Sequence, residues 1–263
     1  MSTFDISGQN LVTLVGIDFS PEIEKLYCYN NQLTNLLGCP PNVKKLYCHN
    51  NQLTSLLGCP PNLKILVCDH NQLTNLLGCP LHLKELYCDY NPLTNLSGCA
   101  PNLKRLFCCY TQLTTLEDCP SNLKYLECHN NQLTSLSGCS TSVQIIRCEY
   151  NNLTSLSGCS PNVQRLYCHN NQLTTLEDCP PNVKELRCEN NPLSDEYKTL
   201  AEIHQINKLK AFQKGILKLN SIIYPPRIQR WWKYRYYDKL NSDGLSLFCL
   251  RSIDDSRQVG IIS

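Results

Sequence analysis

The chain repeats one pattern every twenty residues between Leu26 and Leu193. Each unit follows Leu-x-Cys-x-x-Asn-x-Leu-Thr-x-Leu-x-Gly-Cys-Pro-Pro-Asn-Val-Lys-x, and no insertion shifts the register. A period this short cannot hold two packed helices, and it is too regular for an ordinary globular core. Fixed-period repeats form solenoids, in which each coil packs only on its neighbours. The sequence therefore predicts a solenoid whose function lies on its exposed surfaces.

The repeat columns predict which side chains fill each coil. Leucine occupies one column without exception from Leu33 to Leu193, and cysteine occupies another from Cys28 to Cys188. These residues alternate with variable ones, as the inward side chains of a strand do. An asparagine column, broken only by Thr111, can hydrogen-bond backbone groups where the coil turns. The Gly-Cys-Pro-Pro half excludes a helix and predicts an extended convex segment.

Seventeen of the nineteen cysteines fall in two columns, Cys28–Cys188 and Cys39–Cys179. Reduced cysteine behaves as a small buried hydrophobe. The alternative is a series of disulfides or metal ions along the stack. Stacked strands lie ~4.8 Å apart, whereas a disulfide needs Cβ atoms ~3.8 Å apart, so structural thiols are favoured. Free thiols, and an N-terminus without the basic and apolar layout of a secretory signal, predict an intracellular reducing compartment.

The Leu-x-Cys-x-x-Asn-x-Leu-Thr-x-Leu segment resembles the leucine-rich repeat signature, with cysteine at one conserved leucine position. The twenty-residue period with Pro-x-Asn-Leu-Lys before each strand is similar to the short class of secreted enterobacterial effectors. The abundant cysteine and the Ile-Gln-Arg-Trp-Trp tail are most similar to leucine-rich repeat proteins of giant DNA viruses that infect amoebae. The resemblance implies a right-handed superhelix with a parallel concave β-sheet and an extended, largely non-helical convex side. It also implies protein binding, usually on the concave sheet.

Three regions are expected from the pattern and the charge. Residues 1–22 form a degenerate capping coil, residues 23–194 form about nine repeats, and residues 195–263 form a helical, basic region. Residues 1–194 carry 12 basic and 15 acidic side chains, a net charge of −3, whereas residues 195–263 carry 12 and 7, a net charge of +5. Apolar residues every three or four positions after Ser194 predict an amphipathic helix that caps the array. No segment has the length or apolarity of a membrane span.

A second helix is predicted over residues 227–240, after two prolines. It is basic and aromatic, and part of it resembles the calmodulin-binding IQ motif. The residues concerned are Ile228, Gln229, Trp231, Trp232 and Lys233. Tyr234 replaces the motif's glycine and Asp238 its second basic residue. A docked capping helix is therefore favoured, with a calmodulin-like partner, an anionic surface or nucleic acid as alternatives.

The outward strand positions carry the candidate binding residues. Aromatic side chains predominate there in the first half of the array, and aromatic residues are enriched in protein interfaces. The hypothesised partner-binding residues are Tyr27, Tyr47, Tyr87, Phe107, Tyr125 and Tyr167. Cross-strand packing is an equally good explanation, and both can apply. A lysine row at strand entry could suggest nucleic acid, but the array is net acidic, so a solvated edge is favoured.

One further column carries ligand-type side chains beside the strands. Its members are Asp69, Asp89, Cys109, His129, Glu149, His169 and Glu189. Cys109 beside Asp89 and His129 is the best local cluster for a metal ion. No spacing motif supports a metal, and a solvated polar column is favoured, so no metal or cofactor is predicted.

Three classes of function remain to be weighed. Some of the effectors that the repeats resemble join them to a ubiquitin ligase domain of a few hundred residues with a catalytic Cys-x-Asp. Only 69 residues follow the repeats, and the one cysteine among them, Cys249, precedes Leu250 and Arg251. An enzyme is therefore not favoured. A non-enzymatic protein-interaction module is predicted, with a structural or packaging component of a virion as the alternative.

Overall fold

A computed structural model describes residues 2–195, 197 and 198 of the chain. The chain divides into two compact units, Met1–Pro192 and Leu193–Ser263. In the second unit, the amides of Tyr197 and Lys198 donate to the Ser194 carbonyl at 2.9 and 3.0 Å, as in a first helical turn. The predicted helix over residues 227–240, with its IQ-like residues, lies outside the described residues. The rest of the predicted capping helix lies outside them as well.

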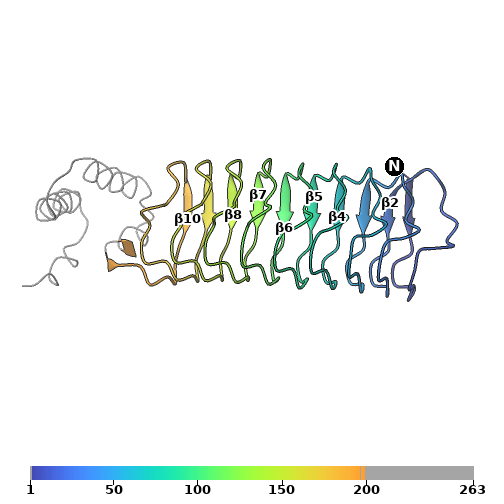
Figure 1. Ribbon diagram of the computed structural model, residues 1–263, viewed down its shortest axis with the longest axis horizontal. Coiled ribbons are helices and arrows are strands. Elements are labelled where there is room, and N and C mark those ends of the chain that lie inside the picture. The colour runs from blue at the N-terminus through green and yellow to red at the C-terminus, as the bar shows by residue number, and fades with distance from the viewer. Residues whose placement is uncertain (1, 196, 199–263) are drawn as a thin grey trace, which may run out of the picture. The chain divides into compact units, whose positions relative to one another are not determined.

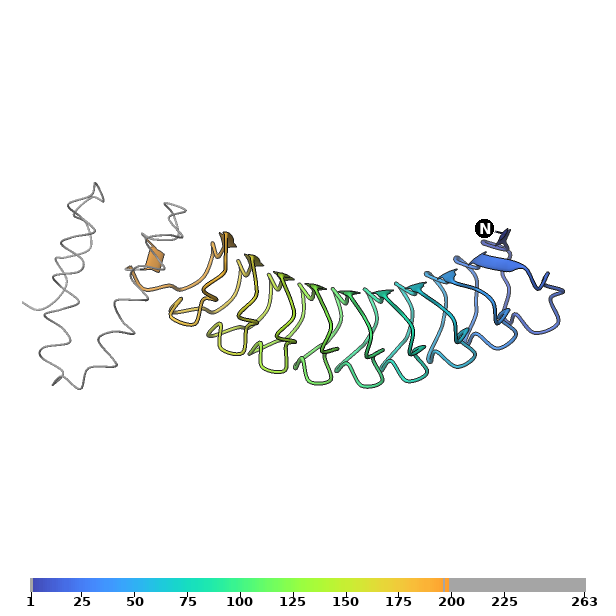
Figure 2. The same ribbon diagram turned by 90° about the horizontal axis from the view of Figure 1, so that it is seen from above.

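The first unit is built on one parallel sheet of ten strands, ordered along the sheet as along the chain (Figure 1). The strands are β1 (Ser2–Asp5), β2 (Ile23–Tyr27), β3 (Lys45–Tyr47), β4 (Ile65–Val67), β5 (Glu85–Tyr87), β6 (Arg105–Phe107), β7 (Tyr125–Glu127), β8 (Ile145–Arg147), β9 (Arg165–Tyr167) and β10 (Glu185–Arg187). Figure 2 shows the strands on the concave side of an arc and the turns on its convex side. No helix occurs between residues 2 and 192. The predicted solenoid, its parallel concave sheet and its non-helical convex side are confirmed.

The twenty-residue period sets the register of the sheet. Leu26 pairs with Leu46 and Leu46 with Leu66, and each later pair is again twenty residues apart. At the N-terminal end Phe4 pairs with Leu26. Equivalent residues therefore stack directly on one another along the sheet, and each repeat column becomes a row on one face.

The core is made of the leucine rows and the first cysteine row. Leu46 is completely buried between the half-buried Lys45 and Tyr47, and the same alternation recurs in strand after strand. Burying one leucine side chain stabilises a fold by about 1.5–3 kcal/mol. Because each coil repeats several such leucines, the stability of the array comes from the contacts between neighbouring coils.

The asparagine row closes the turn at the end of each strand. Asn51 Oδ1 accepts from the amide of Leu33 at 2.9 Å, and its Nδ2 donates to the carbonyls of Cys28 and Cys48 at 2.9 and 3.0 Å. Each amide side chain thus bonds to two coils, which confirms the predicted role. Thr111 keeps one bond of this type, from its hydroxyl to the carbonyl of Cys108 at 3.1 Å.

The two cysteine rows differ in their surroundings. No disulfide bond joins the eighteen cysteines among the described residues. The row from Cys28 to Cys188 is buried, and burial raises the pKa of its thiols. The second row was predicted to point inward as well, but Cys39 and Cys59 are half-buried and only Cys139 and Cys179 are enclosed. The turn that holds this row lies at the convex rim, where no further layer covers it.

Candidate functional site

The hypothesised partner-binding residues form a discontinuous aromatic face on the outer surface of the sheet. Tyr27 and Tyr47 lie with their ring centroids 4.8 Å apart. Tyr87 and Phe107 stack at 4.3 Å, and Phe107 lies 5.3 Å from Tyr125. Val67 separates these two groups, and Glu127 and Arg147 separate the second group from Tyr167. All six aromatic side chains are half-buried, so cross-strand packing accounts for part of their role.

Cationic side chains lie over the rings of this aromatic face. Lys25 Nζ is 4.5 Å from the ring centroid of Tyr27 and 5.3 Å from that of Tyr47. The Arg105 guanidinium lies similarly over Phe107 and Tyr125, at 5.4 and 5.2 Å. Tyr167 has two such neighbours, Arg147 and Arg187, at 5.3 and 5.8 Å. Each group of rings therefore offers an apolar surface and a positive charge side by side.

A second aromatic row lies just beyond the strands and is more exposed. His70 and Tyr90 stack at 4.2 Å, and Tyr90 and Tyr110 stack at 4.5 Å. The tyrosines of this row, which we call the tyrosine edge, are Tyr90, Tyr110 and Tyr150. Their exposed fractions are 45%, 46% and 51%. Among the described tyrosine and phenylalanine side chains, these three are the exposed ones.

The tyrosine edge was not predicted from the sequence, although its column carried a signal. The backbone at Tyr90, Tyr110 and Tyr150 has φ of 53°, 51° and 55°. This left-handed conformation is unfavourable for bulky residues and suits asparagine. Asparagine fills the same column in other coils, at Asn30, Asn50, Asn130, Asn170 and Asn190. An aromatic residue at such a turn therefore departs from the local preference, which makes it a candidate for a role outside the turn.

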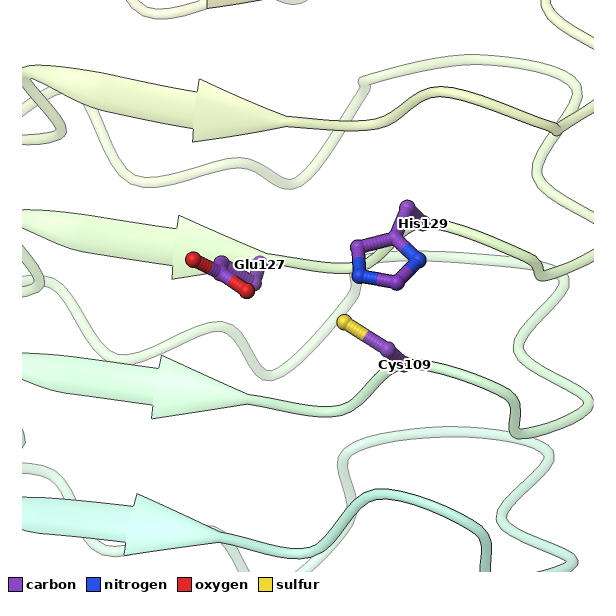
Figure 3. Close-up of side chains that lie close together, drawn as sticks. All are labelled: Cys109, Glu127 and His129. Atoms are coloured by element: carbon purple, nitrogen blue, oxygen red, sulfur yellow. The ribbon is translucent and has the colours of Figure 1, made fainter.

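The ligand-type column forms a chain of contacts beside the sheet. Asp69 Oδ1 accepts from the Asp89 amide at 3.0 Å, and Asp89 Oδ1 accepts from the Cys109 amide at 2.5 Å. Burial, with the nearby charge of Asp89, raises the pKa of Asp69 to about 7. From the sequence, the best candidate set of metal ligands was Asp89, Cys109 and His129. In the structure, the third side chain that meets Cys109 and His129 is Glu127, from the end of β7 (Figure 3). Asp89 instead caps the backbone of Cys109.

Two further rows lie away from the aromatic face. The lysines at strand entry are exposed, and Lys44 pairs with Glu24, as expected for a solvated edge. Leu37, Leu57 and Leu77 lie in turns outside the strands and are 43%, 59% and 59% exposed. At the positions equivalent to these three exposed leucines, later coils carry serine or glutamate. Replacement by serine is therefore compatible with the turn.

The ten-stranded parallel sheet and its twenty-residue coils form a β-solenoid with a leucine-rich repeat fold. No protein-family model and no curated protein matches the chain. Among solved structures, it is similar to the functional domain of InlJ from Listeria monocytogenes, which includes a cysteine ladder, with a TM-score of 0.60 and 28% identity over 74% of this chain and 45% of that one. It is also similar to YopM from Yersinia enterocolitica, with a TM-score of 0.53 and 27% identity over 68% of this chain and 44% of that one.

A third similarity concerns the fold alone. The leucine-rich repeat domain of APL1B matches with a TM-score of 0.56 and 22% identity over 65% of this chain and 56% of that one. The chain thus spans about half the length of each of these three solved structures. Within the described residues, no helix is both long and apolar enough to cross a membrane.

Proposed function

We propose that the chain is a non-enzymatic scaffold that binds a protein partner on its concave side, through the aromatic face and the tyrosine edge. The observation that carries this proposal is the exposed stack of Tyr90 and Tyr110, whose rings lie 4.5 Å apart at the end of the strands that hold Tyr87 and Phe107. Tyrosine is enriched among the residues that dominate binding energy in interfaces. The stack retains a large exposed area at a turn where asparagine would be easier to accommodate.

The chemistry of the face indicates the kind of partner. Aromatic rings with Lys25 and Arg105 above them suit a protein surface that presents apolar side chains flanked by carboxylates. The similar solved structures support a scaffold of this class. The free cysteines support a reducing compartment as the place where it works.

The test compares capture of proteins from cell lysate by full-length baits. The double variant Tyr90→Asn/Tyr110→Asn removes both rings while keeping residues that the same turn carries in other coils. The matched control, Leu57→Ser/Leu77→Ser, removes two exposed apolar side chains outside the face. We expect the first bait to lose a partner that the wild-type and control baits retain. With the purified partner, Kd should rise about 30-fold or more, which corresponds to about 2 kcal/mol.

Equal recovery by all three baits would refute the concave-side proposal. Loss of the partner only from a bait that lacks residues 227–240 would favour the calmodulin-like alternative. Selective capture of virion proteins through the same tyrosines would favour the alternative that the chain is a virion component. That alternative follows from the resemblance of the sequence to proteins of giant viruses. These outcomes separate the surface that binds from the biological role that it serves.

A further inference from the structure

Cys109, Glu127 and His129 lie together beside the strands β6 and β7 (Figure 3). One ligand atom of each, the thiol sulfur, a carboxylate oxygen and a ring nitrogen, lies within 4.8 Å of the other two. Over the described part of the chain, no other group of three metal-binding side chains is this close. We propose that these three residues, the Cys109 site, bind a transition-metal ion such as Zn²⁺.

The backbone fixes the three residues relative to one another. The amide of Cys108 donates to the carbonyl of Glu127 at 2.9 Å, and the amide of Tyr110 donates to the carbonyl of His129 at 3.1 Å. Cys109 is therefore held on both sides by hydrogen bonds to the coil that carries the other two ligands. A site built on paired strands is more precisely placed than one on a free loop.

The three side chains form a donor set that zinc accepts. Thiolate, imidazole and carboxylate bind Zn²⁺ at about 2.0–2.3 Å, so a tetrahedral ion separates its ligand atoms by about 3.3–3.8 Å. Small side-chain rotations within the observed 4.8 Å would close the site around an ion. Cys109 is buried, whereas Glu127 and His129 are half-buried. The fourth coordination position is then left for water or for a donor from outside the chain.

The imidazole already has an outer partner. Asn130 Nδ2 lies 2.9 Å from His129 Nδ1, which leaves Nε2 as the ligand atom. Figure 3 shows one ring nitrogen of His129 directed toward the Cys109 sulfur. The side-chain amide of Asn130 can also present its oxygen, which would accept the Nδ1–H of a metal-bound imidazole. Metal-binding histidines almost always have a second partner of this kind.

The carboxylate and the thiol are held as well. The Tyr125 hydroxyl donates to Glu127 Oε1, and Arg147 Nη1 lies 3.7 Å from the same oxygen. Asp89 Oδ1 accepts from the Cys109 amide at 2.5 Å. These contacts orient two of the three ligands. They are the supporting contacts that metal sites need for tight binding.

The local charge favours a cation. The buried Cys109 side chain lies close to the carboxylates of Glu127 and Asp89. A divalent ion would stabilise the thiolate and both carboxylates together, because metal coordination deprotonates a thiol outright.

The test is titration of the purified, metal-free, full-length protein with Co²⁺ and then Zn²⁺. We expect one Co²⁺ per chain, a thiolate-to-cobalt charge-transfer absorption, and loss of that absorption when Zn²⁺ displaces cobalt, because Zn²⁺ competes for the same donors. Cys109→Ser and His129→Gln should each weaken binding at least about 100-fold, since loss of an outer-shell partner alone costs 10–100-fold. Cys159→Ser, in the second cysteine row, is the matched control and should bind as the wild type does.

Cys109→Asp provides a variant whose residue type the column already carries at Asp69 and Asp89. It should fold normally, bind cobalt weakly and lack the sulfur absorption. Absence of the absorption in the wild-type protein would overturn the proposal. Unchanged absorption in Cys109→Ser and His129→Gln, or its loss in Cys159→Ser, would also overturn it, because either result would place the ion on the cysteine rows.

Discussion

Restoring asparagine at position 111 should stabilise the solenoid. In the neighbouring coils, the amides of Leu73 and Leu113 donate to asparagine Oδ1 atoms at 3.0 and 2.9 Å. The equivalent amide of Leu93 belongs to a completely buried residue and has no acceptor among the described residues. The reason is that Thr111 takes the place of asparagine in this coil, twenty residues after Asn91 and twenty before Asn131. Its hydroxyl does not supply the acceptor that an asparagine Oδ1 provides to the leucine amide of the preceding coil.

The size of the effect follows from these contacts. A buried N–H without a partner costs about 1–3 kcal/mol, and a new hydrogen bond contributes about 0.5–1.5 kcal/mol. Thr111→Asn gains the acceptor for Leu93 but loses the 2.5 Å contact between the Thr111 hydroxyl and Asn131 Oδ1. The net gain should be about 1–2 kcal/mol. For a chain of this size, that raises Tm by about 2–8 °C.

Thermal unfolding followed by circular dichroism measures this shift. Asn71→Thr is the matched control, because it replaces asparagine by threonine at the equivalent position of another coil. It removes the acceptor of the Leu53 amide, which lies 2.9 Å from Asn71 Oδ1. Its Tm should fall by a similar amount. An unchanged or lower Tm in Thr111→Asn, with a fall in Asn71→Thr, would show that the coil at Thr111 has relaxed to satisfy Leu93 in another way and would refute the reasoning.

Three further predictions concern charge, turn conformation and the thiols. Folding raises the pKa of the Asp69 carboxyl from 3.8 to about 7, so the folded protein holds the carboxyl proton more tightly than the unfolded chain, and the free energy of unfolding should fall as pH rises from about 4 to 7. Urea unfolding of Asp69→Asn should show a smaller fall over this pH range. A pH profile identical to that of the wild type would contradict the raised pKa of Asp69. Tyr150→Asn should raise Tm by a few degrees, because asparagine tolerates the φ of 55° better and only an edge contact with His169 is lost. Tyr90→Asn should change Tm little, because the same gain is offset by the loss of two ring stacks. Equal Tm shifts in the two variants would show that the stacks of Tyr90 do not contribute to stability. Thiol labelling of the folded protein at pH 8, read by mass spectrometry, should spare the row from Cys28 to Cys188 and modify half-buried cysteines such as Cys39 first, and rapid labelling of Cys48 would contradict its burial.

The sequence predicted the fold well because a repeat makes one inference nine times over. Leu46 could be assigned to the core because leucine stands twenty residues before and after it, and the structure buries it completely. The asparagine row was predicted in the same way, as was its exception at Thr111. The helices after residue 198 have no such repetition behind them and stay predictions.

The candidate site was predicted only in part. The column alone identified Tyr27, Tyr47, Tyr87 and Phe107 as outward residues, and they are found on the outer surface of the sheet. The column does not indicate how far each side chain is covered by its neighbours, and all four are half-buried. The exposed tyrosine edge was missed because Tyr90 reads as an ordinary variable position until the left-handed backbone of its turn is known.

The sequence by itself determined the period, the register and which columns face the core, because each coil must bury the same apolar side chains against identical neighbours. Only the tertiary structure decided which columns meet across coils. Cys109 and Glu127 stand two columns apart in the repeat, yet their ligand atoms come within 4.8 Å of each other and of His129. The physical reason is that the left-handed turn after each strand sets the direction of the side chains beside it, and a one-dimensional pattern carries no information about that direction.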